Sequence, residues 1–199
     1  MGAHVSHSLL LRTVDQPSDA DLVSRALKGD RWGREMLYRR HAGRLLALAT
    51  RLLASRVDAE EIVQDTFVTG FAQLGALREP PAVGAWLGQI AVSLVRRRIR
   101  KARLLRRLGL DRGADDATLE ALGDPAISPE ERTELALVDR ALGSTSASSR
   151  VAWMLRRVEG LPLADVANLC GCSLATAKRR ITDADRRVAE HVGGDWGEP

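Results

Sequence analysis

The amino-acid sequence predicts an all-α protein of two small helical domains joined by an acidic, flexible linker, the C-terminal domain being a helix-turn-helix. Three observations predict this class. Apolar residues recur at helical spacing through most of the 199 residues, and no stretch shows the alternation of a half-buried strand. A segment rich in Gly, Pro, Asp and Glu separates two helical regions. Near the C-terminus, a glycine turn lies between two amphipathic segments.

The predicted first domain, residues 18–107, contains four helices. The first begins with Ser18 and Asp21 in the spacing of a capping box. The second is expected over 32–53, and the third begins at Asp58 and continues until a proline pair interrupts it. The fourth follows the prolines. Each helix carries an apolar stripe for a shared core, in which Leu27 is one of the residues expected.

The predicted linker covers residues 108–133, and the second domain covers 134–192. The linker is too polar and too interrupted by proline to share a core with either side, so we expect the two domains to fold independently.

Charge is segregated along the chain although the formal net charge is only +4. "DAEEIVQD" (58–65) contains four acids, and "RRRIRKARLLRR" (96–107) contains eight bases in twelve residues. A charge run is commonly a solvated helix face, which is the alternative here. Eight bases within about three turns repel one another at i,i+4, however, unless something neutralises them, and DNA phosphate is the usual neutraliser.

The segment "PLADVANLCGCSLATAKRRITDADRRV" predicts the helix-turn-helix. Gly171 lies at the turn, and Ser173 can cap the helix that follows. That helix is expected to bury Leu174, Ala177, Ile181, Ala184 and Val188 and to project Ala175, Thr176, Lys178, Arg179 and Arg180 outward. Small residues first and bases later suit a helix that enters the major groove. An ordinary αα-hairpin is the alternative.

Other function classes find little support in the sequence. The four histidines are scattered, and no catalytic triad, His-x-x-x-His motif or glycine-rich phosphate loop occurs. Cys170 and Cys172 could bind a metal in principle, but two thiols without further ligands nearby make a poor zinc site. We therefore predict no catalytic residue, no metal and no cofactor, and we expect Cys170 to pack in the helix-turn-helix core. No apolar stretch approaches the ~18 residues of a membrane span. The chain is expected to be a bacterial cytoplasmic protein without direct membrane insertion.

Three segments in order resemble the extracytoplasmic-function (ECF) class of bacterial RNA polymerase sigma factors, within the sigma-70 family. These are "DAEEIVQDTFVTGFAQL", "AWLGQIAVSLVRRRIR" and the helix-turn-helix, with an acidic linker between the last two. The resemblance covers about residues 18–192. It implies a sigma factor that binds core RNA polymerase and directs promoter-specific initiation by reading −10 and −35 elements.

The resemblance also implies partners and site residues. The third helix would dock on the β′ clamp of core polymerase, through Asp58, Glu61, Gln64 and Asp65. The loop at 77–84 would capture a flipped base, and the helix after it would read and open the −10 element; the residues implied are Arg78, Glu79, Ser93, Arg96, Arg97, Arg100 and Lys101. Trp86 is expected in the core rather than stacked on a base. The −35 element would meet Ser173, Ala175, Thr176, Lys178, Arg179 and Arg180.

Further partners are the polymerase β subunit, promoter DNA and, as a candidate, an anti-sigma factor; no small-molecule substrate is expected. Four residues depart from the family pattern, namely Ser93, Arg97, Asp183 and Asp185. The two aspartates should weaken phosphate contact locally, and arginine at either position is expected to strengthen DNA binding. A stand-alone helix-turn-helix regulator with a helical sensor domain is the alternative function, and an enzyme is a more remote one.

Overall fold

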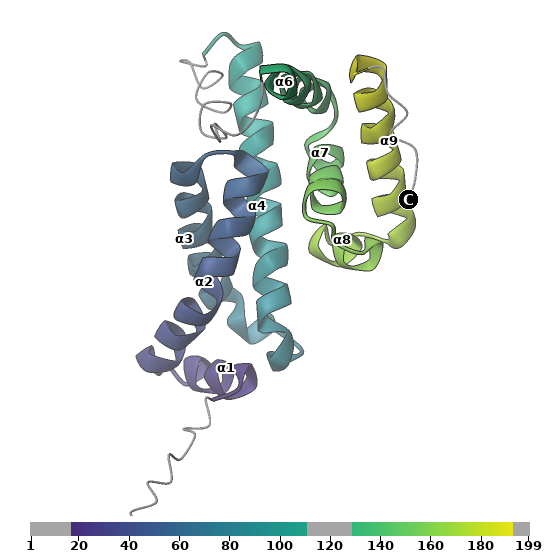
Figure 1. Cartoon of the computed structure of the whole chain (residues 1–199). Helices are drawn as coiled ribbons and strands as arrows, with labels where there is room; N and C mark the ends of the chain where they lie inside the picture. Colours follow the sequence, from purple (N-terminus) through teal and green to yellow (C-terminus); the bar gives the residue numbers. More distant parts are fainter. Residues whose placement is uncertain (1–16, 111–128, 193–199) are drawn as a thin grey trace, which may run out of the picture.

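The computed structural model describes residues 17–110 and 129–192, and these residues form helices and short connections without a strand (Figure 1). The all-α class predicted from the sequence is confirmed. A first group comprises α1 (Asp19–Leu27), α2 (Arg31–Leu53), α3 (Arg56–Gln73) and α4 (Val83–Arg107). A second group comprises α6 (Pro129–Ser144), α7 (Ala147–Trp153), α8 (Leu163–Leu169) and α9 (Leu174–Val192).

Side-chain caps set the helix starts in the first group. The capping box of α1 is present, because Ser18 Oγ accepts from Asp21 N at 3.2 Å and Asp21 Oδ2 accepts from Ser18 N at 3.1 Å. The expected start of the third helix at Asp58 is wrong by two residues. Ser55 caps α3 by accepting from Asp58 N at 3.3 Å, so Arg56 is already helical.

The proline pair produces the predicted interruption between α3 and α4. Two 3₁₀ turns, Leu74–Ala76 and Pro80–Ala82, replace the α-helical path there. Proline suits the first position of such a turn because no hydrogen bond needs its missing N–H. α4 then runs for 25 residues, and in Figure 1 it stands beside α2 and α3 over most of its length.

The second group forms the predicted helix-turn-helix. α8 ends at Leu169 with Cys170 as its C-cap, and Gly171 takes φ +57°. Ser173 Oγ accepts from Thr176 N at 3.2 Å at the start of α9. The first helix of this group begins at Pro129 rather than near 134. A π-helical turn, Met154–Val158, continues α7.

Burial follows the helical stripes with two exceptions. Leu27 and Leu174 are each 54% exposed, so their expected place in the core is wrong. Leu27 is the last residue of α1 and Leu174 is the first residue of α9. Cys170 is 1% exposed, as predicted. Trp86 is half-buried and packs against the core.

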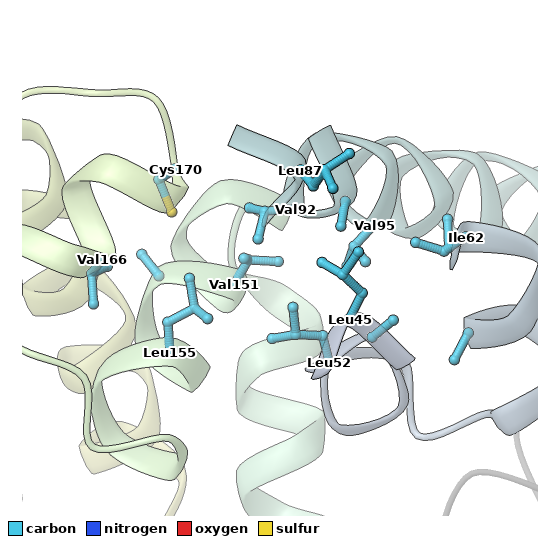
Figure 2. Packing of buried hydrophobic residues seen from close by; sticks show 14 of the residues in the cluster. Leu45, Leu52, Ile62, Leu87, Val92, Val95, Val151, Leu155, Val166 and Cys170 are labelled. Carbon is cyan, nitrogen blue, oxygen red and sulfur yellow. The ribbon is translucent and has the colours of Figure 1, made fainter. Parts of the chain in front are cut away.

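The two groups pack against each other along α4. Figure 2 shows Val92 and Val95 of α4 in the same buried cluster as Val151 and Leu155 of the second group. The sequence led us to expect two domains that fold independently and a linker that shares a core with neither. Residues 111–128 of the predicted linker lie outside the described part of the chain, and the domain boundaries remain a prediction. The described helices nonetheless bury apolar side chains between the groups.

Candidate nucleic-acid interface

The basic run of α4 divides between two faces of the helix. On one face, Ser93, Arg97, Arg100 and Lys101 are exposed and form no ion pair within the described residues. Their spacing of three and four places them on one stripe. This stripe contains four of the seven residues predicted for the −10 element.

Other arginines of the run are held inside the molecule. Arg96 Nη1 donates to the carbonyl of Cys170 at 3.1 Å. Arg103 donates to the carbonyls of Thr145 and, at 3.2 Å, Leu142. The sequence predicts DNA phosphate as the neutraliser of this run, but protein carbonyls neutralise part of it. Arg96, predicted to face the −10 element, faces the second group instead.

Arg98 joins α4 to the acidic helix α3. It pairs with Asp58, and its Nη1 lies 2.9 Å from Glu61 Oε2. Burial lowers the pKa of Arg98, but the hydrogen bond and charge of Asp58, with those of Glu61, outweigh burial and raise it. The positive charge of Arg98 thus offsets the acidity of the predicted polymerase-docking face.

The exposed face of α3 is mixed in character. Gln64 and Asp65 are exposed, and Val57 and Val68 beside them are 70% and 64% exposed. The apolar pair was missed from the sequence. Val57, Glu61, Gln64 and Val68 follow one another at spacings of four, three and four, which is the signal that would have placed them on one face.

The loop before α4 is exposed at its tip and anchored at its end. Arg78 and Glu79, both predicted to meet the −10 element, are exposed. Behind them, Arg44 Nη2 donates to the carbonyl of Gly84 at 3.0 Å. A Cβ on Gly84 would lie 2.9 Å from His41 Cε1, so this position is tightly filled. The tip of the loop is thus exposed, while its end at Gly84 is held by Arg44 and packed against His41.

α9 presents a polar stripe away from the core. Among the predicted −35 residues, Ala175, Lys178 and Arg179 are exposed. The hydroxyls of Ser173 and Thr176 lie 2.9 Å apart and hydrogen-bond with each other, so they serve the helix cap.

Arg180 differs from the other predicted −35 residues. It is half-buried, and its Nη1 is enclosed without a hydrogen-bond partner among the described residues. The structure adds Thr182 and Arg186, both exposed, to the stripe that includes Ala175 and Arg179.

The comparisons with known proteins identify the family. The family model described as Sigma-70 region 2 matches residues 37–105. The chain is 30% identical over 177 residues to the ECF RNA polymerase sigma factor SigM of Mycobacterium tuberculosis, with 88% of this chain and 85% of that protein covered. The chain belongs to the ECF class of RNA polymerase sigma factors.

Further relatives agree with that membership. The sigma factor is 28% identical over 183 residues to the RNA polymerase sigma-H factor of Pseudomonas aeruginosa, covering 88% of this chain and 94% of that one. Among solved structures, CnrH bound to the cytosolic domain of CnrY has a TM-score of 0.54 at 23% identity, with coverages of 90% and 99%. RpoE of Bartonella quintana, solved with the anti-sigma factor NepR, has a TM-score of 0.50 at 24% identity, with coverages of 81% and 97%. These two structures support the fold.

As an ECF sigma factor, the chain is a transcription initiation factor that acts with core RNA polymerase at promoter DNA. The function predicted from the sequence is confirmed over the stand-alone regulator. Sigma factors are initiation factors rather than catalysts. Within 17–110 and 129–192, no helix is long and apolar enough to cross a membrane, and no cluster of three or more metal-ligating side chains occurs.

The two aspartates that depart from the family pattern have different surroundings in this sigma factor. The Asp183 side chain is 50% exposed and lies 3.4 Å from Arg186. Asp185 is half-buried and accepts from Trp153 Nε1 at 2.8 Å and from Arg157 Nη2 at 3.0 Å. Asp185 therefore holds α9 against the end of α7 and the π-helical turn. Arginine in place of Asp185 would remove these hydrogen bonds, which the sequence-based expectation for arginine at either position did not take into account.

Proposed function

We propose that this sigma factor opens and reads the −10 element through the exposed stripe of α4 and the loop before it. The observation that carries the proposal is the contrast between the two faces of α4. Arg97, Arg100 and Lys101 have no ion partner within the described chain, whereas Arg96 and Arg103 are hydrogen-bonded to protein carbonyls. Unpaired bases aligned on one helix face suit contact with DNA phosphates.

The −35 element is assigned to the exposed part of α9. Lys178 and Arg179 supply donors for base edges or phosphates, and Ala175 leaves room for the helix to enter the groove. Arg180 contributes less than the sequence suggests, because its guanidinium is partly enclosed. The polymerase is assigned to α3, where Gln64 and Asp65 are exposed between two valines.

In vitro transcription with purified core polymerase tests the −10 assignment. Replacing Arg97, Arg100 and Lys101 together by alanine should abolish transcription and flatten the salt dependence of promoter binding, by about one unit of slope for each phosphate that the variant no longer contacts. A matched control removes three exposed bases elsewhere, Lys28, Arg31 and Arg39. Equal transcription by both triple variants would contradict the assignment.

The domain division is part of the proposal. Residues 18–107 and 134–192 each carry buried apolar residues of their own. Brief proteolysis should cut first within the linker at 108–133 and release these two fragments. Because the groups also pack on each other, the cut fragments should co-elute at low ionic strength and separate in denaturant. Cleavage spread evenly over both fragments would contradict the division.

The proposal also covers an anti-sigma partner and the cellular location of the chain. Both solved sigma factors were captured with a second protein, and we extend this to a cognate anti-sigma factor that a tagged copy of the chain should co-purify. We assign the chain to the bacterial cytoplasm, where core polymerase works, and assign it no catalysis, small-molecule substrate, cofactor or metal. Transcript starts mapped with and without the chain would identify its promoters.

A further inference from the structure

One side chain of α2 packs against the start of α4. A Cβ on Gly84, the second residue of α4, would lie 2.9 Å from Cε1 and 3.1 Å from Nδ1 of His41. These distances are well inside the ~3.5 Å at which such atoms pack. Glycine therefore suits position 84 because the imidazole ring already occupies the space of a side chain.

The ring of His41 also contacts α1. Its Nε2 lies 3.2 Å from Asp19 Oδ2, and the His41 side chain is only 11% exposed. Nε2 makes no hydrogen bond within the described residues, so its link to the Asp19 carboxylate is electrostatic. Asp19 is itself held in place, because its other oxygen accepts from Arg40 Nη1 at 2.7 Å. The imidazole thus reaches from the first residue of α1 to the second residue of α4.

Arg44 holds the same part of α4 through its backbone. Arg44 lies one turn beyond His41 on α2, and its Nη2 donates to the carbonyl of Gly84 at 3.0 Å. The ring of His41 limits how closely Gly84 can approach α2, and the hydrogen bond from Arg44 keeps Gly84 from moving away. A repulsive and an attractive contact on one residue fix its distance from α2 in both directions.

The loop before α4 is supported from the side of α1 as well. In Figure 1, α1 lies at the end of the helix bundle where α4 begins, and it packs on the 3₁₀ turn Pro80–Ala82. Val83, between that turn and Gly84, is buried. The exposed tip with Arg78 and Glu79 is only a few residues from this anchored end. The place of the tip therefore depends on where Gly84 is held.

The position of Gly84 also affects the rest of α4. Arg97 follows Gly84 by about 20 Å along the helix, at ~1.5 Å per residue. Because α4 is one continuous helix, a shift of its first turn moves the exposed stripe together with the loop. Binding sites lose function when the residues that support them leave the contacting groups about 1 Å too loose.

We propose that His41 is a positioning residue for −10 recognition. Its ring, oriented by Asp19, acts through Gly84 and places the loop before α4 and the exposed stripe of α4 so that both meet the −10 element together. His41 does not touch DNA in this role, because it is buried. The proposal rests on the assignment of the loop and the stripe to the −10 element. In the sequence, His41 is only one of four scattered histidines.

Promoter opening by the holoenzyme tests this role. Permanganate reactivity of unpaired thymines in the −10 element measures opening. Gly84→Ala should reduce opening at least about ten-fold, because the new Cβ overlaps with the ring and displaces the start of α4. His41→Ala should reduce opening several-fold, because the approach of α4 is then no longer limited. In the chain with His41→Ala, adding Gly84→Ala should cost nothing further, because the ring is gone.

Asp19→Asn tests the link to α1. Asparagine keeps the size of the side chain and removes its charge. Opening should fall several-fold in the original chain and should not fall further in the His41→Ala chain, because Asp19 acts through the ring. Gly75→Ala is the matched control, since a Cβ on Gly75 would meet no atom within 4 Å, and it should leave opening unchanged.

Binding to core polymerase and thermal unfolding separate positioning from folding. The His41→Ala and Asp19→Asn chains should bind core polymerase like the original chain. Losses of opening that only follow losses of core binding or of Tm would overturn the proposal, as would normal opening by His41→Ala or an equal effect of Gly84→Ala with and without the ring. If Gly84→Ala does not fold alone, the Asp19→Asn and His41→Ala comparison decides in its place.

The proposed function is checked separately in the same assay. The chain with alanine at Arg97, Arg100 and Lys101 is measured beside the His41 variants. Normal opening by that chain would contradict the −10 assignment itself. Impaired opening by that chain together with unimpaired opening by His41→Ala would leave the assignment intact and refute the role of His41.

Discussion

Asp185 and Asp183 of α9 form a matched pair whose substitutions should have different outcomes. Arginine at both positions changes the charge equally. Asp185 accepts hydrogen bonds from Trp153 and Arg157 and its side chain is 21% exposed, whereas the side chain of Asp183 is 50% exposed and lies 3.4 Å from Arg186. We expect Asp185→Arg to destabilise the fold and Asp183→Arg to strengthen DNA binding.

The magnitude follows from the hydrogen bonds that Asp185 accepts. Asp185→Arg leaves the Trp153 indole N–H and the Arg157 guanidinium without their acceptor and sets a second cation beside Arg157. Each unpaired donor costs about 1–3 kcal/mol, reduced where water can reach it, as at Arg157. A loss of about 2–3 kcal/mol in the free energy of unfolding lowers the Tm by roughly 4–12 °C. Asp183→Arg removes a surface pair worth at most about 1 kcal/mol.

Thermal unfolding followed by circular dichroism gives the first measurement, and promoter binding by the holoenzyme over a range of salt concentrations gives the second. Asp183→Arg should steepen the dependence of log K on log salt by about one, because it adds one phosphate contact. Asp185→Asn keeps an acceptor for Trp153 and should lie between Asp185→Arg and the unchanged chain in Tm. An Asp185→Arg chain of unchanged Tm that binds DNA more tightly would refute the reasoning.

Three further substitutions or reactions have expected outcomes. Ala54 closes α2 with φ +52°, a conformation that favours glycine, so Ala54→Gly should raise the free energy of unfolding by about 0.5–1 kcal/mol in urea titrations; a lower value would contradict this. Asp65→Lys should weaken binding to core polymerase at least ten-fold in a pull-down titration, while Glu60→Lys, also exposed on α3, serves as the control; equal losses would point to general charge repulsion. Burial raises the pKa of the Cys170 thiol, so iodoacetamide should modify Cys172 first, as read by peptide mass spectrometry, and faster labelling of Cys170 would disprove this.

The sequence predicts the helices well because each depends on local signals. Ser18 with Asp21, the proline pair and Gly171 act within a few residues of where they stand, and the structure confirms all three. Leu174 is a residue whose burial these local signals predict wrongly. Its spacing from Ala177 places it on the buried stripe, but it is the first residue of α9, and its exposed fraction is 54%.

Contacts between helices far apart in the sequence could not be predicted, and the reason is physical. The direction in which an arginine points depends on which acceptor lies within reach, and that depends on tertiary packing. Arg96 and Arg97 are adjacent and chemically identical, yet one binds the Cys170 carbonyl and the other faces outward. The charge pattern alone can therefore predict that some bases of α4 meet DNA. It cannot tell which arginines face DNA and which bind other parts of the protein.

The arginines of α4 make different kinds of contact, which explains why arginine, rather than lysine, suits this helix. A guanidinium has five donors and keeps its charge even where burial, with Arg150 nearby, lowers its pKa, as at Arg103. It can therefore bind two carbonyls at a helix end, as Arg103 does, or two carboxylates on a neighbouring helix, as Arg98 does. One rigid helix thus contacts α3 through Arg98, the second group through Arg103, and, in our proposal, the promoter through Arg97.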